Sequence, residues 1–410
     1  MKKNIIIKIV LLIYTLIIML PPLIHGYIYP NRGDDAAFHL NYFDRLRSGA
    51  EGSVSNYIGQ DIVGYPILWL NDVTGLSTEV LFLWFNYLVL WLVGIAAFVL
   101  IAKFIDWKVG LLSIPLVMFM SPSTLNLFHT GAIFDLVTVG VLLPSVIYCC
   151  LRLLPGRKWH WAIPIVILGG LVLFLHTMGI WRGGFEWGGL GEQSIPTMKE
   201  FIEVVIGVSM FAFAALSITI FLAKYKHFKM SRNDKVLLIG LSSIVLLMGV
   251  LVFTGIIGWS LRIALDLAIV FPLAIACVLG VAIRRVKNEV IWAALFAIVI
   301  AGSIPQLTNY YNYNSAVLPI DKEVIEYVNT LPGDYYSCSP EVSHWIYSRF
   351  LNKKYKDGEL PYIARSQPMT PRSTPGSLGY WGDLNVITNY PLDDAKQFKE
   401  GWLEIYVVNP

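Results

Sequence analysis

Two adjacent carboxylates and a nearby imidazole form the densest group of potentially reactive side chains in this sequence. Asp34 and Asp35 follow Gly33, and His39 comes four residues after Asp35. A carboxylate of this kind can act as a general base, and a neighbouring imidazole can position it. The same residues also fit an ordinary turn, in which Gly33 supplies the bend and Asp34 caps a helix. The surrounding elements must decide between these two interpretations.

The composition predicts an α-helical polytopic membrane protein. Of the 410 residues, 56% are hydrophobic and 14% are charged, whereas about 25% are charged in a typical soluble domain. The net charge of +3 gives no reason to expect a nucleic-acid partner. Apolar runs long enough to cross about 30 Å of hydrocarbon predict nine spans, near residues 5–24, 80–102, 109–126, 132–154, 161–180, 201–223, 236–257, 262–283 and 289–304. The first run lacks a small-x-small cleavage site, so we expect a retained anchor.

The orientation of these spans follows from the basic residues in the short connections. Lys and Arg occur at the N-terminus and in every second connection, near 103–108, 152–158, 224–235 and 284–287. Such connections are usually cytoplasmic. The N-terminus is therefore predicted inside, and loop 25–79, turn 121–131, loop 181–200 and the tail from 305 outside. The Asp34 and Asp35 pair is then extracytoplasmic, in the plasma membrane of a prokaryote, where a cytosolic nucleotide substrate is disfavoured.

Loop 25–79 contains a predicted amphipathic helix over residues 35–48. Its apolar Phe43 and Leu46 alternate with charged residues such as Asp44 and Arg47 at helical spacing, as in helices that lie at a membrane interface. Asp35 and His39 stand at i and i+4 and share one face of this helix. Further on, the apolar residues 67–70 are expected to dock back towards the bilayer.

The tail is predicted to be a separate small domain, so the chain divides into residues 1–304 and 305–410. Strand-like segments at Tyr335–Cys338, Val386–Thr388 and Leu403–Val408 alternate with helical segments at 321–331, 340–351 and 393–399. Alternation of this kind is typical of a parallel α/β layer. We expect an extracytoplasmic α/β domain without catalytic groups. The four cysteines imply no disulfide framework.

Other candidate site residues occur near the predicted outer ends of the spans. Asp135 opens the fourth span, and His129 precedes it in the same outside turn. A charged residue at this depth costs about 1–3 kcal/mol unless it is paired or faces water. Asp135 is therefore either a helix N-terminal carboxylate stabilised by the dipole or a third carboxylate facing Asp34 and Asp35. His176 near the end of the fifth span is either a packing residue or a supporting site residue.

Two arginines on the outer side are candidates for binding a phosphate. Arg262 starts the eighth span, and Arg182 lies in loop 181–200. A guanidinium group matches phosphate oxygens with two parallel donors. For Arg262 the alternative is an intrahelical ion pair with Asp266 at i+4.

These motifs together resemble the GT-C fold glycosyltransferases. The resemblance rests on the acidic pair and His39 in the first outside loop, the Gly64-Tyr65-Pro66 segment before the second span, and Gly131 four residues before Asp135. Protein O-mannosyltransferases and aminoarabinose transferases carry Asp-Glu where this chain has Asp34 and Asp35. The stretch ending at Asp135 is similar to a Gly-x-x-Asp-Asn-Glu region of oligosaccharyltransferases, although Leu136 and Val137 replace the Asn and Glu. The layout agrees over roughly residues 1–285.

The resemblance implies inverting transfer of a sugar from a polyprenyl-phosphate donor to a glycan, lipid or protein acceptor. Asp34 or Asp35 is then the catalytic base, supported by His39, Asp135, His129 and His176, while Arg262 and Arg182 hold the donor phosphate. The mannosyl and aminoarabinose enzymes are not expected to need a metal. The three carboxylates Asp34, Asp35 and Asp135 would nevertheless suit a divalent cation such as Mg²⁺ or Mn²⁺.

Other classes of protein also fit the sequence. A transporter or flippase of lipid-linked glycans would show polar or broken helices at mid-depth, and the predicted spans look continuous there. A glycan ligase or polymerase would carry a large late outside loop rather than a terminal domain. A receptor-like anchor for the tail would need fewer spans.

Overall fold

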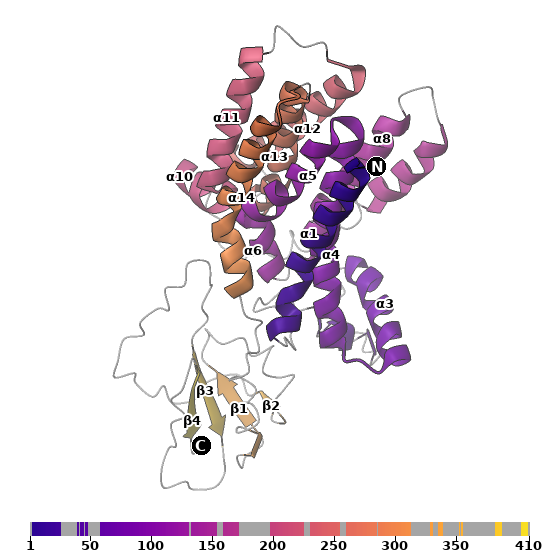
Figure 1. The fold of residues 1–410 in the computed structure, drawn as a ribbon. Coiled ribbons are helices and arrows are strands. Elements are labelled where there is room, and N and C mark those ends of the chain that lie inside the picture. Colours follow the sequence, from indigo (N-terminus) through magenta and orange to yellow (C-terminus); the bar gives the residue numbers. More distant parts are fainter. Residues whose placement is uncertain are drawn as a thin grey trace.

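A computed structural model of the chain describes residues 2–25, 39–40, 42–44, 46–47, 58–130, 133–153, 159–171, 197–224, 230–254, 260–284, 286–312, 329–330, 335–338, 352, 354–355, 382–387 and 403–408. These residues form a helical bundle and a small sheet (Figure 1). The bundle contains α1 (Lys2–His25), α3 (Ile58–Thr74), α4 (Thr78–Phe104), α5 (Trp107–Pro115), η1 (Leu116–Met120), α6 (Pro122–Thr130), α7 (Ile133–Asp135), η2 (Leu136–Leu142), α8 (Leu143–Leu153), η3 (Trp159–Trp161), α10 (Met198–Glu200), η4 (Phe201–Ile206), α11 (Val208–Lys224), α12 (Arg232–Thr254), α13 (Ser260–Ile283) and α14 (Glu289–Asn312).

Six helices in the described part of the chain are long and apolar enough to cross a membrane. They are Lys3–Ile24, Thr78–Phe104, Ile133–Leu153, Arg232–Thr254, Ile263–Ile283 and Glu289–Tyr311. The structure thus confirms a helical membrane protein, and six of the nine predicted spans match these helices. Each of the other three predicted spans coincides with a shorter apolar helix, at Trp107–Met120, Ala162–Leu171 and Val208–Ala223.

Helix α13 is the centre of the bundle. Within its apolar window 89% of the residues are buried, compared with 17% in α12 and 22% in α14. The exposed large hydrophobic residues of α12 and α14 are Leu, Ile and Val, together with Phe253, as expected for surfaces that face lipid. Small residues allow close approach on the buried side: a Cβ built on Gly280 of α13 would lie 2.5 Å from Ile105 and 3.0 Å from Val109.

Local capping sets the start of three helices, α4, α5 and α12. The Ser77 side chain accepts a hydrogen bond from Val80 N at the start of α4, and Asp106 accepts one from Lys108 N at the start of α5. Before α12, Asp234 accepts from Ser231 N at 2.6 Å, while the Ser231 hydroxyl accepts from Asp234 N at 3.1 Å. This reciprocal pair satisfies N–H groups that a helix terminus leaves without partners.

The two prolines of α1 are matched by two tyrosines of α14. Pro21 and Pro22 lie inside α1, and since proline has no N–H, the carbonyls four residues earlier lose their helical donors. Those carbonyls belong to Ile17 and Ile18. The Tyr311 hydroxyl donates to Ile17 O at 3.2 Å and the Tyr310 hydroxyl to Ile18 O at 2.7 Å. The proline pair therefore interrupts α1 without leaving its backbone unsatisfied, and it ties α1 to α14.

Two expectations about the ends of the spans were wrong. The ninth span does not stop before Pro305, because α14 continues through it to Asn312; membrane helices tolerate proline when neighbouring groups satisfy the backbone. The predicted turn 121–131 is mostly helix α6, in which Pro122 occupies the first turn, where its missing N–H costs nothing.

The tail contains a four-stranded sheet in the order β2-β1-β3-β4, formed by β1 (Tyr335–Cys338), β2 (Lys354–Tyr355), β3 (Gly382–Ile387) and β4 (Leu403–Val408). The three predicted strands are confirmed, with β3 starting earlier than expected. The sheet is mixed rather than parallel, because β1 and β3 pair antiparallel. Of the predicted helix 321–331 the structure describes only residues 329 and 330, which are helical, and the other two predicted helices lie outside the described residues.

Candidate functional site

The described part of the first loop packs as a short helix onto α3 and α4. Residues 39–40, 42–44 and 46–47 are helical, as predicted. Phe43 and Leu40 are buried, and the Phe43 ring contacts Phe82 of α4 edge to face at 5.4 Å between centroids. Gly64 of α3 makes this approach possible, because a Cβ there would lie 2.9 Å from Phe43 and 2.8 Å from Leu46. The amphipathic pattern thus buries one face against protein.

His39 is buried between two spans rather than at a free surface. Its side chain is 6% exposed, and its ring meets Phe82 of α4 at 5.6 Å and Phe134 of α7 at 4.9 Å, both edge to face. Phe134 is directly followed by Asp135. The structure therefore brings the imidazole from the first loop to the helix that carries the third predicted carboxylate.

Asp135 lies at a change of helix type. It ends α7, and the backbone continues without interruption into the π-helical segment η2. Its side chain is 3% exposed, so it does not stand at an open outer surface as a cavity-facing carboxylate would. Short π-helical segments are rare and occur often at functional sites. Burial of an ionisable side chain inside a membrane bundle likewise favours a functional role.

Two buried polar residues were missed in the sequence. Asn86 of α4 is 0% exposed and Thr138 of η2 is 2% exposed. Their signal was a polar side chain inside an otherwise apolar span, which is uncommon because burying it is costly. Asp266 of α13 is also buried, although it was considered only as an ion-pair partner of Arg262.

The remaining predicted site residues are placed only in part. Asp34, Asp35, His176 and Arg182 lie outside the described residues. His129 belongs to α6 and Arg262 to α13, but their side chains are not among those described. The predicted metal site of Asp34, Asp35 and Asp135 therefore remains an expectation. Among the described residues, no group of three or more His, Cys, Asp and Glu side chains could hold a metal ion.

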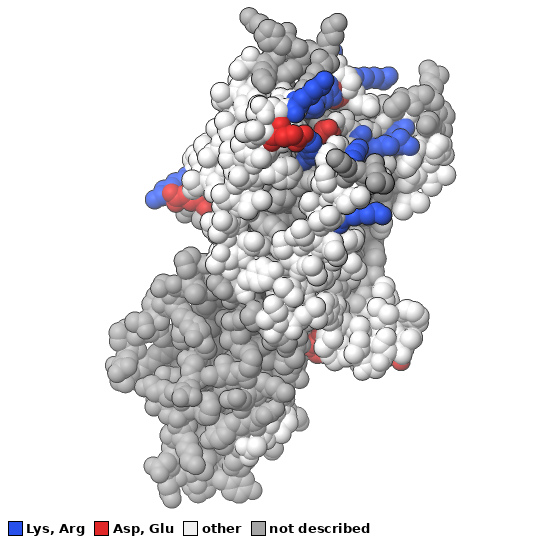
Figure 2. Space-filling view, viewed as in Figure 1, with Lys and Arg blue, Asp and Glu red and all other residues white. Residues whose placement is uncertain are grey.

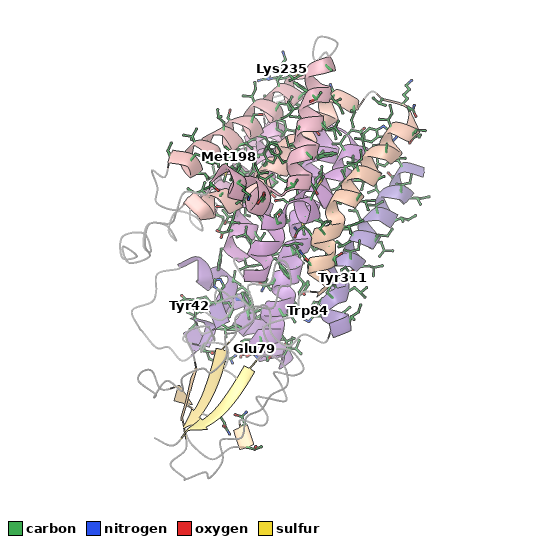
Figure 3. The ribbon with its side chains drawn as sticks, turned by 90° about the vertical axis from the view of Figure 1, so that its left-hand side faces the viewer. Tyr42, Glu79, Trp84, Met198, Lys235 and Tyr311 are labelled. Atoms are coloured by element: carbon green, nitrogen blue, oxygen red, sulfur yellow. The ribbon has the colours of Figure 1, made fainter. Side chains whose placement is uncertain are left out.

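Charged side chains gather at the opposite end of the bundle. On the face drawn in Figure 2, most described Lys and Arg lie at the end that carries the N-terminus. Arg284 there binds the buried Asp234 through two contacts of 2.8 Å. Lys108 pairs with Glu289 at 2.9 Å and lies 5.1 Å from the Trp292 ring centroid. In Figure 3, Lys235 marks this end, while Tyr42 and Glu79 mark the end with the first-loop helix.

The fold and the site together define a helical membrane protein with a buried polar group near one end of its bundle. No protein-family model matches the chain, and no curated protein is similar to it in sequence.

Proposed function

We propose that this chain is an integral membrane glycosyltransferase that moves a sugar from a polyprenyl-phosphate donor to an extracytoplasmic acceptor, with inversion at the anomeric carbon. One observation carries the proposal: the first-loop helix docks so that His39 lies against Phe134, the residue next to Asp135. A reaction centre assembled from the first loop and the start of a later span is what the GT-C resemblance requires.

In the proposed reaction the Asp34 carboxylate takes the proton of the acceptor hydroxyl. The acceptor oxygen then attacks the anomeric carbon from the face opposite the phosphate, and the bond to the phosphate oxygen breaks with its electron pair. The polyprenyl phosphate leaves, and Arg262 and Arg182 stabilise its charge. His39 and Asp135 support the base. The reaction needs no redox partner, and a divalent cation would add only charge stabilisation.

The proposed topology has nine spans, with the N-terminus cytoplasmic and the tail extracytoplasmic. Two findings support it. The three shorter apolar helices occupy the positions of the three remaining predicted spans, and most described Lys and Arg lie at one end (Figure 2). On this topology the first-loop helix and the proposed α/β domain share the outer side, where the domain would shape access of the acceptor. A prokaryotic plasma membrane is the proposed location.

The proposal is tested by single-turnover transfer from a polyprenyl-phosphate sugar. Asp34→Asn is nearly isosteric and is expected to slow transfer about 10²–10⁴-fold, the usual contribution of a general base, without changing donor binding. Asp35→Asn is expected to cost less. Near-normal transfer in Asp34→Asn together with loss of transfer in Asp35→Asn would show that Asp35, rather than Asp34, is the catalytic base. Normal transfer in both variants would refute the enzyme interpretation of the pair.

A transporter of lipid-linked glycans is the second candidate, because two helices are broken where they meet. The expectation of continuous spans was wrong at Gly207, which follows the end of η4 at Ile206 and has a φ of +86°; η1 ends at Met120, directly before Ser121. The hydroxyls of Ser121 and Ser123 both donate to Val205 O, at 3.3 and 2.6 Å. Broken helices that meet inside a bundle are typical of transporters. In Figure 3, Met198, just before η4, lies between the ends marked by Lys235 and Glu79.

Transport and transfer are separated by one assay in sealed proteoliposomes. A lipid-linked glycan with a fluorescent label crosses the bilayer without chemical change if the chain is a carrier, whereas the sugar moves to a new acceptor if it is a transferase. Gly207→Val would strain the positive φ and bring a side chain against Pro122, since a Cβ there lies 2.8 Å from its Cδ. A carrier is expected to lose movement in this variant.

A further inference from the structure

One cation at the basic end of the bundle lacks the kind of partner that comparable cations have. Among the Lys and Arg side chains that the structure describes, three are not exposed: Lys108, Arg152 and Arg284. Lys108 pairs with Glu289 at 2.9 Å, and Arg284 binds Asp234. Arg152 makes no ion pair and no side-chain hydrogen bond with any described residue. A charge that is partly withdrawn from water is normally paired, so the anion for Arg152 is expected to come from outside the bundle.

Aromatic contacts fix the place of Arg152. It stands in the last turn of α8. Tyr148, one turn earlier in α8, packs edge to face on Phe104 at 5.4 Å between centroids, and Phe104 ends α4, four residues before Lys108. The Trp161 ring of η3 meets Tyr148 at 6.0 Å. Arg152 therefore lies at the basic end, beside a row of rings that leads from α4 to the start of the next apolar helix.

The guanidinium group of Arg152 is held over the Trp161 ring. Its central carbon lies 5.5 Å from the ring centroid, within the range of a cation–π contact. Its Nε is buried without a partner, whereas its two terminal nitrogens are not buried, so their N–H groups are available to a ligand. The Trp161 Nε1 is also buried and unpaired, so the ring acts through its face rather than through its N–H. An arginine held in this way offers two parallel donors to an anion.

An exposed apolar surface begins next to this guanidinium group. Trp161 is directly followed by the helix Ala162–Leu171, whose Ile163, Val166 and Ile167 are 65%, 72% and 56% exposed. Positions i, i+3 and i+4 form one stripe on a helix, so a surface suited to acyl chains starts within a turn of Trp161. Trp is enriched where spans leave the hydrocarbon and meet the headgroups. A free anion would use the charge of Arg152 but not the apolar stripe, whereas a phospholipid would use both.

We propose that Arg152 and Trp161 bind the phosphate of an anionic phospholipid, whose acyl chains lie along Ile163, Val166 and Ile167. The terminal nitrogens of Arg152 donate to two phosphate oxygens, and the Trp161 ring keeps the guanidinium group in place. Anionic lipids are characteristic of the cytoplasmic leaflet, which is the leaflet that the proposed topology assigns to the basic end. The lipid site lies at the end of the bundle opposite the candidate functional site and does not depend on the proposed sugar transfer.

The lipid site is tested by native mass spectrometry of the full-length, delipidated protein in detergent, titrated with phosphatidylglycerol. The wild type is expected to bind a first molecule of phosphatidylglycerol at lower concentration than phosphatidylcholine, whose choline group offsets the phosphate charge. Arg152→Gln is expected to weaken this first binding step about tenfold to hundredfold, as for the loss of hydrogen bonds to a charged group. Arg152→Lys is expected to weaken it less, because it keeps the charge but lacks the parallel donors.

Arg232→Gln is the matched control. Arg232 is an exposed arginine at the start of α12, three residues before Lys235, which marks the basic end in Figure 3. The variant changes the net charge by the same amount, and we expect it to bind the first phosphatidylglycerol as the wild type does. An equal loss in both glutamine variants would mean that surface charge alone attracts the lipid, which would overturn the site. Equal binding of phosphatidylcholine, or full competition by inorganic phosphate at the same concentration, would overturn the assignment to an anionic lipid.

A second measurement locates the acyl chains. Phosphatidylglycerol with a photoreactive diazirine in its acyl chain, present as a minor component of phosphatidylcholine proteoliposomes, is expected to cross-link to residues 163–167 of the wild type and much less to those of Arg152→Gln. Ile298, Ile300 and Ile304 of α14 are exposed at the bundle surface, and their cross-linking to bulk lipid is expected to be equal in both proteins. No change at 163–167, or a parallel fall at α14, would contradict the proposal. If Arg152→Gln does not fold, Arg152→Lys takes its place in both measurements and must show the smaller loss.

Discussion

At the scale of residues, burial determines how much each ion pair contributes to the stability of this protein. The bundle holds two ion pairs at the end with the N-terminus, and they differ mainly in exposure. The Asp234 side chain is 0% exposed and accepts from Arg284, whereas Glu289 is 79% exposed in its pair with Lys108. An exposed pair is usually worth about 0–1 kcal/mol, while removing one partner of a buried pair costs about 3–5 kcal/mol.

Arg284→Met is therefore expected to destabilise the protein by about 3–5 kcal/mol, because it leaves the Asp234 carboxylate buried without its cation. Arg284→Lys keeps the charge but not both parallel contacts, and we expect an intermediate loss. The measurement is thermal unfolding in detergent at constant pH and lipid content.

Lys108→Met is the matched control, since it removes a cation from the exposed pair at the same end and is expected to change stability by less than about 1 kcal/mol. Equal effects of the two methionine variants would contradict the importance of burial. If Arg284→Met does not fold, a comparison of the folded yields of Arg284→Lys and Lys108→Met still tests whether the buried ion pair contributes more to stability than the exposed pair.

At the scale of elements, the contact between α1 and α14 explains how prolines are accommodated in the first span. The pattern is specific: Pro21 and Pro22 deprive Ile17 O and Ile18 O of helical donors, and Tyr311 and Tyr310 supply hydroxyls to those two atoms. Tyr310 also touches the rings of Tyr87 and Phe128 at 6.4 and 6.0 Å between centroids. The end of α14 is thus held by the spans from which the proposed site is built.

Tyr310→Phe is expected to cost about 1–3 kcal/mol, the range for leaving a buried acceptor unsatisfied. In a Pro22→Ala background the new N–H can bond to Ile18 O within α1, so the same tyrosine change is expected to cost much less. A double-mutant cycle on thermal stability measures this difference as an interaction energy.

Tyr14→Phe provides the comparison for this cycle. The Tyr14 hydroxyl donates to Leu90 O and Trp91 O at 3.3 and 3.2 Å, but both carbonyls lie inside the continuous helix α4 and keep their helical donors. We therefore expect Tyr14→Phe to lower the stability less than Tyr310→Phe does. Additive effects of Tyr310→Phe and Pro22→Ala would show that the hydroxyl does not substitute for the missing N–H.

At the scale of the whole molecule, the sequence predicted the helical membrane class, three strands and nine spans, six of which match long apolar helices, because apolar runs and alternating patterns are local signals. It could not predict that α14 continues through Pro305 to Asn312, since the contacts that hold the end of α14, from Tyr310 and Tyr311 to Ile18 O and Ile17 O, join it to α1, almost 300 residues away in the chain. It also missed the helix break at Gly207, which depends on contacts between α6 and η4.

The candidate site, like the fold, could be predicted from the sequence only in part. His39 and Asp135 were chosen as polar residues near span ends, and the structure brings their elements together through Phe134. The expected pairing of His39 with Asp35 involves a residue outside those described, and the observed surroundings of His39 are aromatic. Helical spacing on one helix could not reveal neighbours that belong to two other helices.

The orientation of the whole molecule gives the last prediction. In a variant without native cysteines, Leu76→Cys places a thiol in the exposed turn between α3 and α4, and Lys235→Cys places one near the start of α12 (Figure 3). A membrane-impermeant maleimide is expected to label Leu76→Cys in intact cells, and Lys235→Cys only after the cells are opened, because the Lys- and Arg-rich end should face the cytoplasm. The reverse labelling pattern would show that the protein has the opposite orientation in the membrane. It would place the first-loop helix in the cytoplasm, where a donor carried on the outer leaflet could not reach His39 and Asp135, and the proposed extracytoplasmic transfer would be wrong.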